Sequence, residues 1–197
     1  GSALKADGSA AMALLVTHLS AATATLTWMG IEWKVNGKPS VLGAATGAIA
    51  GLAAVTPASG FIGPAGALAI GFTSGALCYF ASTAVKKRFA YDDSLDVVGV
   101  HGVGGFIGVV MVAFFAHPAL GGIGYGSPGV AGINPSHGMP EQLKAQLIGG
   151  VVTIVYTLVA SILVFWVIDK TVGLRVSEAD EEQGLDLAEH AETGYNL

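Results

Sequence analysis

Five apolar stretches of this chain are each close to the length that crosses a lipid bilayer as a helix. They cover about residues 10–33, 40–55, 64–85, 97–116 and 147–168, and the second is the shortest. An α-helix needs roughly 20 apolar residues to cross the hydrocarbon layer. Charged residues make up 12% of the chain, against roughly 25% in soluble globular domains. The sequence therefore predicts an all-α membrane protein with about five transmembrane helices within residues 1–173.

Glycines in the second stretch indicate how its helix packs. Gly43, Gly47 and Gly51 recur at four-residue spacing, which places them on one helix face. Small residues at such positions let the backbones of two membrane helices approach closely. We therefore expect a tight contact between this helix and a neighbour.

The basic residues predict which helix ends face the cytoplasm. Lys34 and Lys38 lie between the first two stretches, residues 86–88 (Lys-Lys-Arg) follow the third, and Arg175 follows the fifth. Lysine and arginine in short loops favour the cytoplasmic side of a membrane. We therefore expect a multi-pass protein of the cell membrane, plasma or inner, with residues 174–197 as a cytoplasmic tail.

The rest of the composition excludes several classes of function. Seven of the fourteen acidic residues lie in the last twenty positions, and no basic surface for nucleic acid remains. The one cysteine, Cys78, has no partner for a disulfide or a cysteine metal site. The glycines of residues 102–105 lack the preceding strand and the third glycine of a nucleotide-binding loop. With no nucleophile–base pair or metal cluster in the sequence, we expect no enzyme, no cofactor and no bound metal.

His101 is the single ionisable residue within residues 97–116. Ionisable side chains inside membrane segments are costly, and they usually face the interior of a bundle or a water-filled cavity. On an ideal helix His101 shares a face with Gly104, Gly105 and Gly108, a strip almost without side chains. The strip predicts either a narrow lumen beside the imidazole or a close approach of another helix. Two interpretations of His101 follow: a pore-lining residue, or a packing histidine that hydrogen-bonds a neighbouring helix.

A second histidine, His18, lies within the first apolar stretch. We interpret it as a packing or interhelical hydrogen-bonding residue, because no further pattern assigns it a role.

Acidic residues precede the fourth stretch. Asp93 or Ser94 can cap its helix, and Asp96 falls in the predicted first turn, where the helix dipole favours a carboxylate. Helix capping is one interpretation of Asp93 and Asp96, and proton handling is the other.

Five short motifs are spaced along the whole chain. They are residues 1–4 (Gly-Ser-Ala-Leu), 39–43 (Pro-Ser-Val-Leu-Gly), 55–60 (Val-Thr-Pro-Ala-Ser-Gly), 92–102 (Asp-Asp-Ser-Leu-Asp-Val-Val-Gly-Val-His-Gly) and 171–176 (Thr-Val-Gly-Leu-Arg-Val). In this order and spacing they resemble the ammonium transporter (Amt/Mep/Rh) family, and its bacterial Amt branch in particular. The resemblance implies an eleven-helix fold of two inverted halves, assembled as a homotrimer with one pore per subunit. This chain then corresponds to the end of the sixth helix through the eleventh, with a cytoplasmic regulatory tail.

The resemblance also implies roles for individual residues. His101 matches the second of two pore histidines, and Val97 lies on the same helix face. Ser2 matches the serine of an outer site that recruits ammonium, and a frayed chain end is the alternative explanation. Thr56 matches a pore-wall position, although a turn residue that ends a helix explains it nearly as well. The first pore histidine and the aromatic gate are expected upstream of these residues in the family fold.

The function that the resemblance implies is transport of ammonium or ammonia through a narrow hydrophobic pore. An idealised Born estimate puts the cost of moving a small cation into a low-dielectric interior at roughly 20 kcal/mol, whereas neutral ammonia avoids this cost. A neutral imidazole offers ammonia one hydrogen-bond donor and one acceptor. The residues leave open whether NH3, NH4+ or NH3 with a separate proton crosses. The alternative function is an ammonium sensor or a regulator of a PII-type signalling protein, which the tail would contact.

Overall fold

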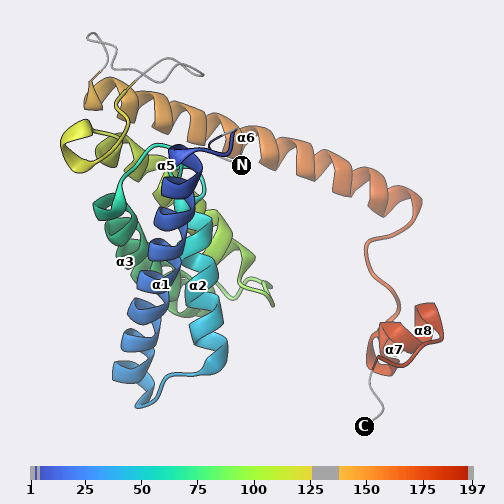
Figure 1. Cartoon of the computed structure of the whole chain (residues 1–197). Helices are drawn as coiled ribbons and strands as arrows, with labels where there is room; N and C mark the ends of the chain where they lie inside the picture. Colours follow the sequence, from blue (N-terminus) through green and yellow to red (C-terminus); the bar gives the residue numbers. More distant parts are fainter. Residues whose placement is uncertain (1–2, 4, 126–137, 195–197) are drawn as a thin grey trace. The chain divides into compact units, whose positions relative to one another are not determined.

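The computed structural model describes residues 3, 5–125 and 138–194, and every regular element in these ranges is helical. In chain order (Figure 1) they are α1 (Gly8–Asn36), α2 (Val41–Val55), α3 (Pro64–Phe80), the π-helix η1 (Ala81–Val85), α4 (Lys86–Phe89), the π-helix η2 (Val98–Gly102), α5 (Val103–Phe115), the 3-10 turn η3 (Pro118–Leu120), α6 (Met139–Thr171), α7 (Glu178–Gln183) and α8 (Leu185–His190).

The chain packs as two compact units, Gly1–Gly150 and Val151–Leu197. The first unit holds α1 to α5 and the beginning of α6, and the second holds the rest of α6 with α7 and α8. Our predicted division between a transmembrane part, 1–173, and a cytoplasmic tail, 174–197, concerns placement in a membrane rather than packing. It therefore stays a prediction.

Local chemistry sets the ends of the first helices. The Asp7 carboxylate accepts a hydrogen bond from the Ser9 N–H at 2.9 Å and caps α1, which ends at Asn36 and is followed by Gly37 with a φ of 77°. The Ser40 hydroxyl accepts from the Gly43 N–H at 2.8 Å and caps α2. Pro64 opens α3, where its missing N–H costs no hydrogen bond. These are the signals that stop and start helices in the sequence.

Helix α6 begins earlier than its apolar stretch. It starts at Met139, eight residues before position 147, and continues to Thr171. The added segment contains Pro140 in the first turn, followed by glutamate, glutamine, leucine and lysine. Proline is tolerated in a first helical turn and the other residues favour helix, so the helix extends beyond the apolar part.

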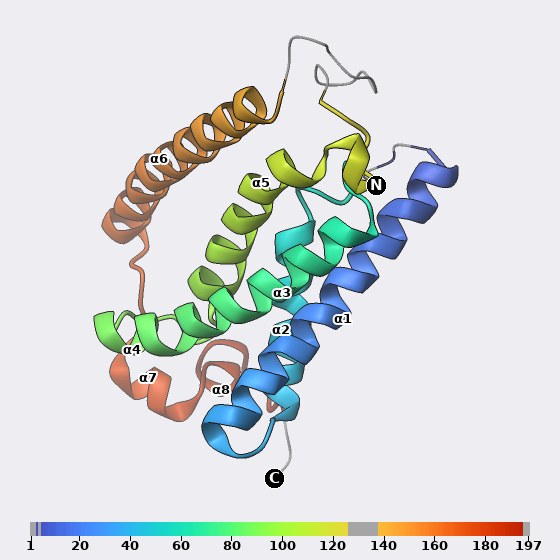
Figure 2. The ribbon, with the colours of Figure 1, turned by 90° about the vertical axis from the view of Figure 1, so that its left-hand side faces the viewer.

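Four helices in the described part of the chain are long and apolar enough to cross a membrane. They are Gly8–Asn36, Pro64–Phe89, Val98–Phe115 and Met139–Thr171, and α2 is an apolar helix of shorter length. Within the first unit α1 and α3 run in one direction and α2 and α5 in the other (Figure 2). The α1–α2 connection and α4 therefore lie toward the same end of that unit.

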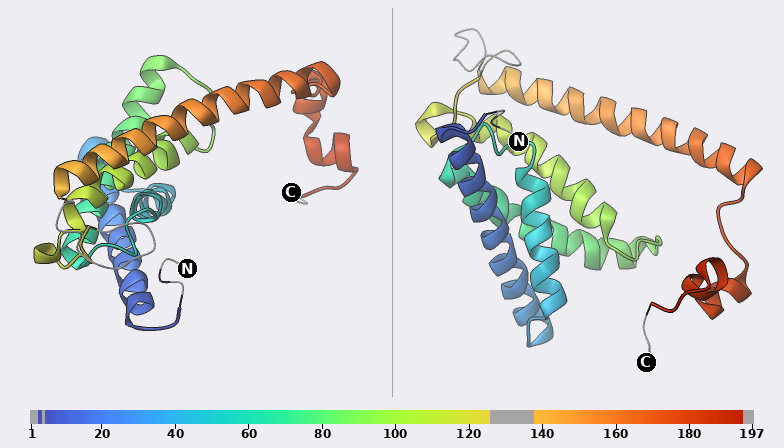
Figure 3. Two further views of the ribbon diagram at one scale, coloured as in Figure 1. Left: turned by 90° about the horizontal axis from the view of Figure 1, so that it is seen from above. Right: turned by 45° about the vertical axis from the view of Figure 1, so that its right-hand side comes forward.

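The first unit is held together by close helix contacts through small residues. Helix α1 (blue in Figure 3) lies beside both α2 and α3. Gly51 of α2 and Gly71 of α3 both lie against the Ser20 carbonyl of α1, where an added Cβ would overlap the backbone. The Ser20 hydroxyl donates a 2.9 Å hydrogen bond to the Gly51 carbonyl. A Cβ added at Gly47 would lie 2.7 Å from the Trp28 Cβ of α1, and these contacts confirm the tight packing predicted for this glycine series.

Candidate functional site

A π-helical turn carries His101 into the fourth apolar stretch. Helix η2 covers Val98–Gly102 and continues directly into α5. The imidazole of His101 is exposed in the structure of this chain. Single π-helical turns inside longer helices are rare and are frequent at functional sites. The local backbone therefore marks the position that the sequence also singled out.

Two rows of residues along η2 and α5 have different surroundings. Val100, Gly104, Gly108 and Val112 form a buried row at four-residue spacing. The other row starts at Val97, which is 50% exposed, and continues through His101 to Gly105. A Cβ added at Gly105 would meet nothing within 4 Å. His101 therefore lies on an open row with Val97 and Gly105, next to the buried row.

The glycine strip predicted around His101 is thus divided between two faces. Gly108 lies so close to α2 that an added Cβ would overlap the Ala54 carbonyl. Gly104 is 3.4 Å, measured from its ideal Cβ position, from the Cys78 sulfur of α3. Both glycines serve the close approach of α5 to its neighbours, and Gly105 alone remains beside His101. The π-helical turn contributes to the different placement of His101 and Gly108, because its i→i+5 hydrogen bonds do not follow the 3.6-residue period that we assumed.

Thr56 lies at the end of α2. Its hydroxyl donates a 2.6 Å hydrogen bond to the Leu52 carbonyl one turn earlier, and the residue is exposed. Thr56 is two residues beyond Ala54, and Gly108 of α5 packs against the Ala54 carbonyl. Gly108 is itself seven residues beyond His101, which corresponds to about 10 Å along a helix. Thr56 and His101 therefore belong to neighbouring helices at different heights. The geometry agrees with a turn residue that ends a helix, and the pore-wall role of Thr56 stays a prediction.

Ser2, the predicted recruitment residue, lies outside the described residues.

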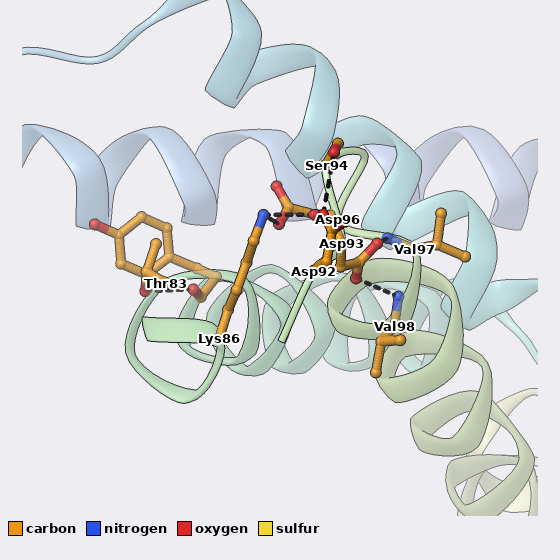
Figure 4. Close-up of polar contacts among 9 residues, drawn as sticks. Thr83, Lys86, Asp92, Asp93, Ser94, Asp96, Val97 and Val98 are labelled. Atoms are coloured by element: carbon orange, nitrogen blue, oxygen red, sulfur yellow. Dashed lines mark hydrogen bonds and ion pairs between the residues drawn. The ribbon is translucent and has the colours of Figure 1, made fainter. Parts of the chain in front are cut away.

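The acids before η2 form the polar network of Figure 4. The Asp93 carboxylate accepts hydrogen bonds from the N–H groups of Val97 and Val98, each at 2.8 Å. Asp93 thus caps the helix, as its position in the sequence indicated. Asp96 lies immediately before the helix rather than in its first turn, and its backbone is left-handed with a φ of 55°.

Lys86, the first residue of α4, joins this network from the other end of the segment that connects α4 to η2. Its Nζ donates to Asp96 Oδ1 at 2.8 Å and also to the backbone carbonyl of Asp93. The side chains of Lys86 and Asp96 are 29% and 30% exposed. Sequence reasoning assigned Lys86 only to the basic cytoplasmic end. Its partner is ten residues away across an irregular segment, and no periodic pattern reports such a pairing.

Comparison with known proteins identifies the relatives of this chain. The model of the Ammonium Transporter Family matches residues 1–195. The chain belongs to this family. An ammonium transporter of Aquifex aeolicus (strain VF5) is 43% identical over 197 residues, which cover 100% of this chain and 44% of that relative.

Solved structures of the ammonium transporter family share the fold. Mep2 of Saccharomyces cerevisiae matches with a TM-score of 0.72 and 30% identity over 87% of this chain and 39% of its own. A sensor Amt protein matches with a TM-score of 0.78 and 27% identity over 94% of this chain and 43% of its own. The predicted fold class, an all-helical membrane protein of the ammonium transporter type, is confirmed. The family is one of transporters rather than enzymes, and the chain spans less than half the length of these relatives.

Proposed function

We propose that this chain is the C-terminal part of an ammonium transporter and that His101 lines its conduction path. The family membership supports the substrate, and the open row of Val97, His101 and Gly105 supports the position of the path. An exposed imidazole on an apolar membrane helix is costly unless it faces a partner or a polar cavity. The single observation that carries the proposal is this imidazole beside an empty glycine position.

The open row is also the surface that the remaining helices of such a transporter would cover. Relatives are more than twice as long as this chain, since it covers 44% of the Aquifex aeolicus protein. In inverted-repeat transporters the substrate site lies near the bilayer midplane between the two repeats. We therefore propose that further helices pack against the His101 row and close the path. The homotrimer and the position in the cell membrane with a cytoplasmic C-terminus are part of the same proposal.

The proposed path favours ammonia as the species that passes His101. A neutral molecule avoids the charge-burial cost of the ion, which is roughly 20 kcal/mol in the idealised estimate. The neutral imidazole can accept a hydrogen bond from ammonia or donate one to it. A proton released before the path either stays outside or crosses separately, and imidazoles are suited to such a relay.

The test is flux through the full-length protein in proteoliposomes. We expect uptake of labelled methylammonium that ammonium competes away, because both share the small cationic head group. Current recorded in the same preparation separates net movement of charge from movement of the neutral species. If the protein is shown to be incorporated into the liposomes and binds ammonium but gives no flux, transport is contradicted and the sensor function is favoured.

The tail is proposed to regulate the path and to contact a PII-type signalling protein. In the second unit Arg175 donates two hydrogen bonds to the Glu181 carboxylate, at 2.8 and 2.9 Å. These bonds lower the pKa of Glu181. A carboxylate with a lowered pKa stabilises the folded form at every pH above its unfolded pKa. The stabilisation by the Arg175–Glu181 pair is therefore lost only as the pH falls through the lowered pKa of Glu181. The pairing is therefore present at neutral pH.

Truncation of the full-length protein after Val176 tests the tail. We expect insertion and membrane abundance to stay unchanged, because the truncation leaves every apolar helix intact. The transport rate or the binding of a PII-type protein should change, measured by methylammonium uptake and by pull-down. If both equal the full-length values, the tail has no regulatory role.

A further inference from the structure

Two π-helical turns from different parts of the chain pack against each other, and one of them contains His101. η1 (Ala81–Val85) ends α3, and η2 (Val98–Gly102) begins the helix of His101. They meet at Ser82 and Gly99, where a Cβ added to Gly99 would overlap the Ser82 hydroxyl and approach the Ser82 Cα to 3.1 Å. The position of η2 is therefore set against η1 rather than by its own sequence alone.

The Lys86–Asp96 pair spans the same two segments. Lys86 follows η1 directly, and Asp96 stands two residues before η2. The ammonium group of Lys86 binds both the Asp96 carboxylate and the Asp93 carbonyl, while the Asp93 carboxylate holds the first N–H groups of the helix. An unbroken chain of hydrogen bonds thus leads from the end of η1 to the first turn of the His101 helix (Figure 4).

The π-helical turn η2 contains His101, so its backbone geometry sets the direction of the imidazole. A shift of one residue in helical register rotates a side chain by about 100° around the helix axis. His101 is the direct neighbour of Val100, which is only 2% exposed and packs with Cys78 and Trp28. If η2 relaxed to a regular α-helical turn while α5 stayed against α2, the side chains before α5 would rotate by about this amount. The His101 imidazole would then turn away from Gly105, which belongs to α5 and would stay in place.

We propose that Lys86 and Asp96 are positioning residues for transport, which clamp the π-helical turn that presents His101 on the open row. The inference rests on the proposed function, because it assigns the pair a role through His101. An ordinary surface ion pair contributes little to stability. The side chains of Lys86 and Asp96 are each about 70% buried. The pair joins Asp96, whose backbone is left-handed, to Lys86 at the start of α4. Its effect is therefore expected in the orientation of His101 rather than in the overall fold.

The experiment uses the full-length protein with Lys86→Met, Asp96→Asn and the double variant. We expect each single variant to lower the maximal methylammonium flux about tenfold, and the double variant to be no worse, because two residues that act as a unit are not additive. Half-saturation should stay unchanged, since the pair is remote from the entry of the substrate. Lys86→Arg keeps the donor and the charge, and it should retain most of the flux.

Lys87→Met is the matched control, because Lys87 is the next residue, is exposed, and makes no ion pair among the described residues. It should transport as wild type does. If Lys86→Met fails to reach the membrane, Asp96→Asn carries the test, since asparagine readily adopts the left-handed backbone of this position.

The outcomes separate this inference from the proposed function. Wild-type flux in Asp96→Asn, together with loss of flux in His101→Ala, would overturn the clamp and leave the pore assignment intact. Additive losses in the double variant, or an equal loss in Lys87→Met, would also overturn it. Wild-type flux in His101→Ala would instead contradict the proposed function itself.

Discussion

Replacing His101 by alanine in the full-length protein is expected to reduce methylammonium uptake by roughly 5- to 140-fold. The range follows from the cost of leaving ammonia in the closed path without its hydrogen bond to the imidazole, roughly 1–3 kcal/mol for a buried polar group, at about 1.4 kcal/mol per tenfold change. Membrane abundance and thermal stability should stay close to wild type, because the imidazole belongs to neither hydrophobic core cluster of the described residues. Uptake by cells or proteoliposomes, normalised to protein, measures the effect.

Two further variants show how the imidazole acts. His101→Gln keeps one hydrogen-bond donor and one acceptor but cannot relay a proton in the physiological range. It should retain more uptake than His101→Ala, and any current carried by a proton relay should disappear. His18→Ala is the matched control, because His18 is also a histidine on an exposed position of a membrane-length helix. Equal losses in His18→Ala and His101→Ala would show a general effect of removing a histidine and would refute the pore assignment.

The parts of the fold that the sequence predicted depend on interactions within one helix. Apolar length marked α1, α3, α5 and α6, because a membrane-crossing helix needs a minimum run of apolar residues wherever it packs. The cap by Asp93 was predictable for the same reason, since its partners are four and five residues away in the chain. The early start of α6 was missed because polar residues that favour helix add no hydropathy signal.

The parts that the sequence did not predict depend on contacts between segments. We placed His101, Gly104 and Gly108 on one face by assuming a regular 3.6-residue period. The π-helical turn at Val98–Gly102 is instead stabilised by packing against η1 and by the Lys86 network, neither of which is visible in a local pattern. The direction of the side chains on this helix was therefore predicted incompletely from the sequence, and the choice of the His101 helix as the site stays a prediction.

Gly108 is expected to be the glycine of this helix that tolerates substitution least. Gly108→Ala places a Cβ onto the Ala54 carbonyl of α2 and within 2.8 Å of the Pro57 ring. Neither the backbone carbonyl nor the proline can move without displacing α2, so α5 must shift away. Overpacking of this kind costs about 1–3 kcal/mol, and leucine at the same position should cost more. Thermal unfolding of the full-length protein in detergent measures the loss.

Gly105→Ala is the control within the same helix, three residues away, because a Cβ there meets nothing within 4 Å in this chain. The two glycines are chemically identical, so a difference in unfolding temperature reports only their surroundings. We expect Gly105→Ala to retain the wild-type unfolding temperature while Gly108→Ala loses stability. A bulky residue at Gly105 should then lower uptake without lowering stability, since it would narrow the row beside His101. Equal unfolding temperatures for Gly108→Ala and wild type would show that α5 does not pack against α2 as described.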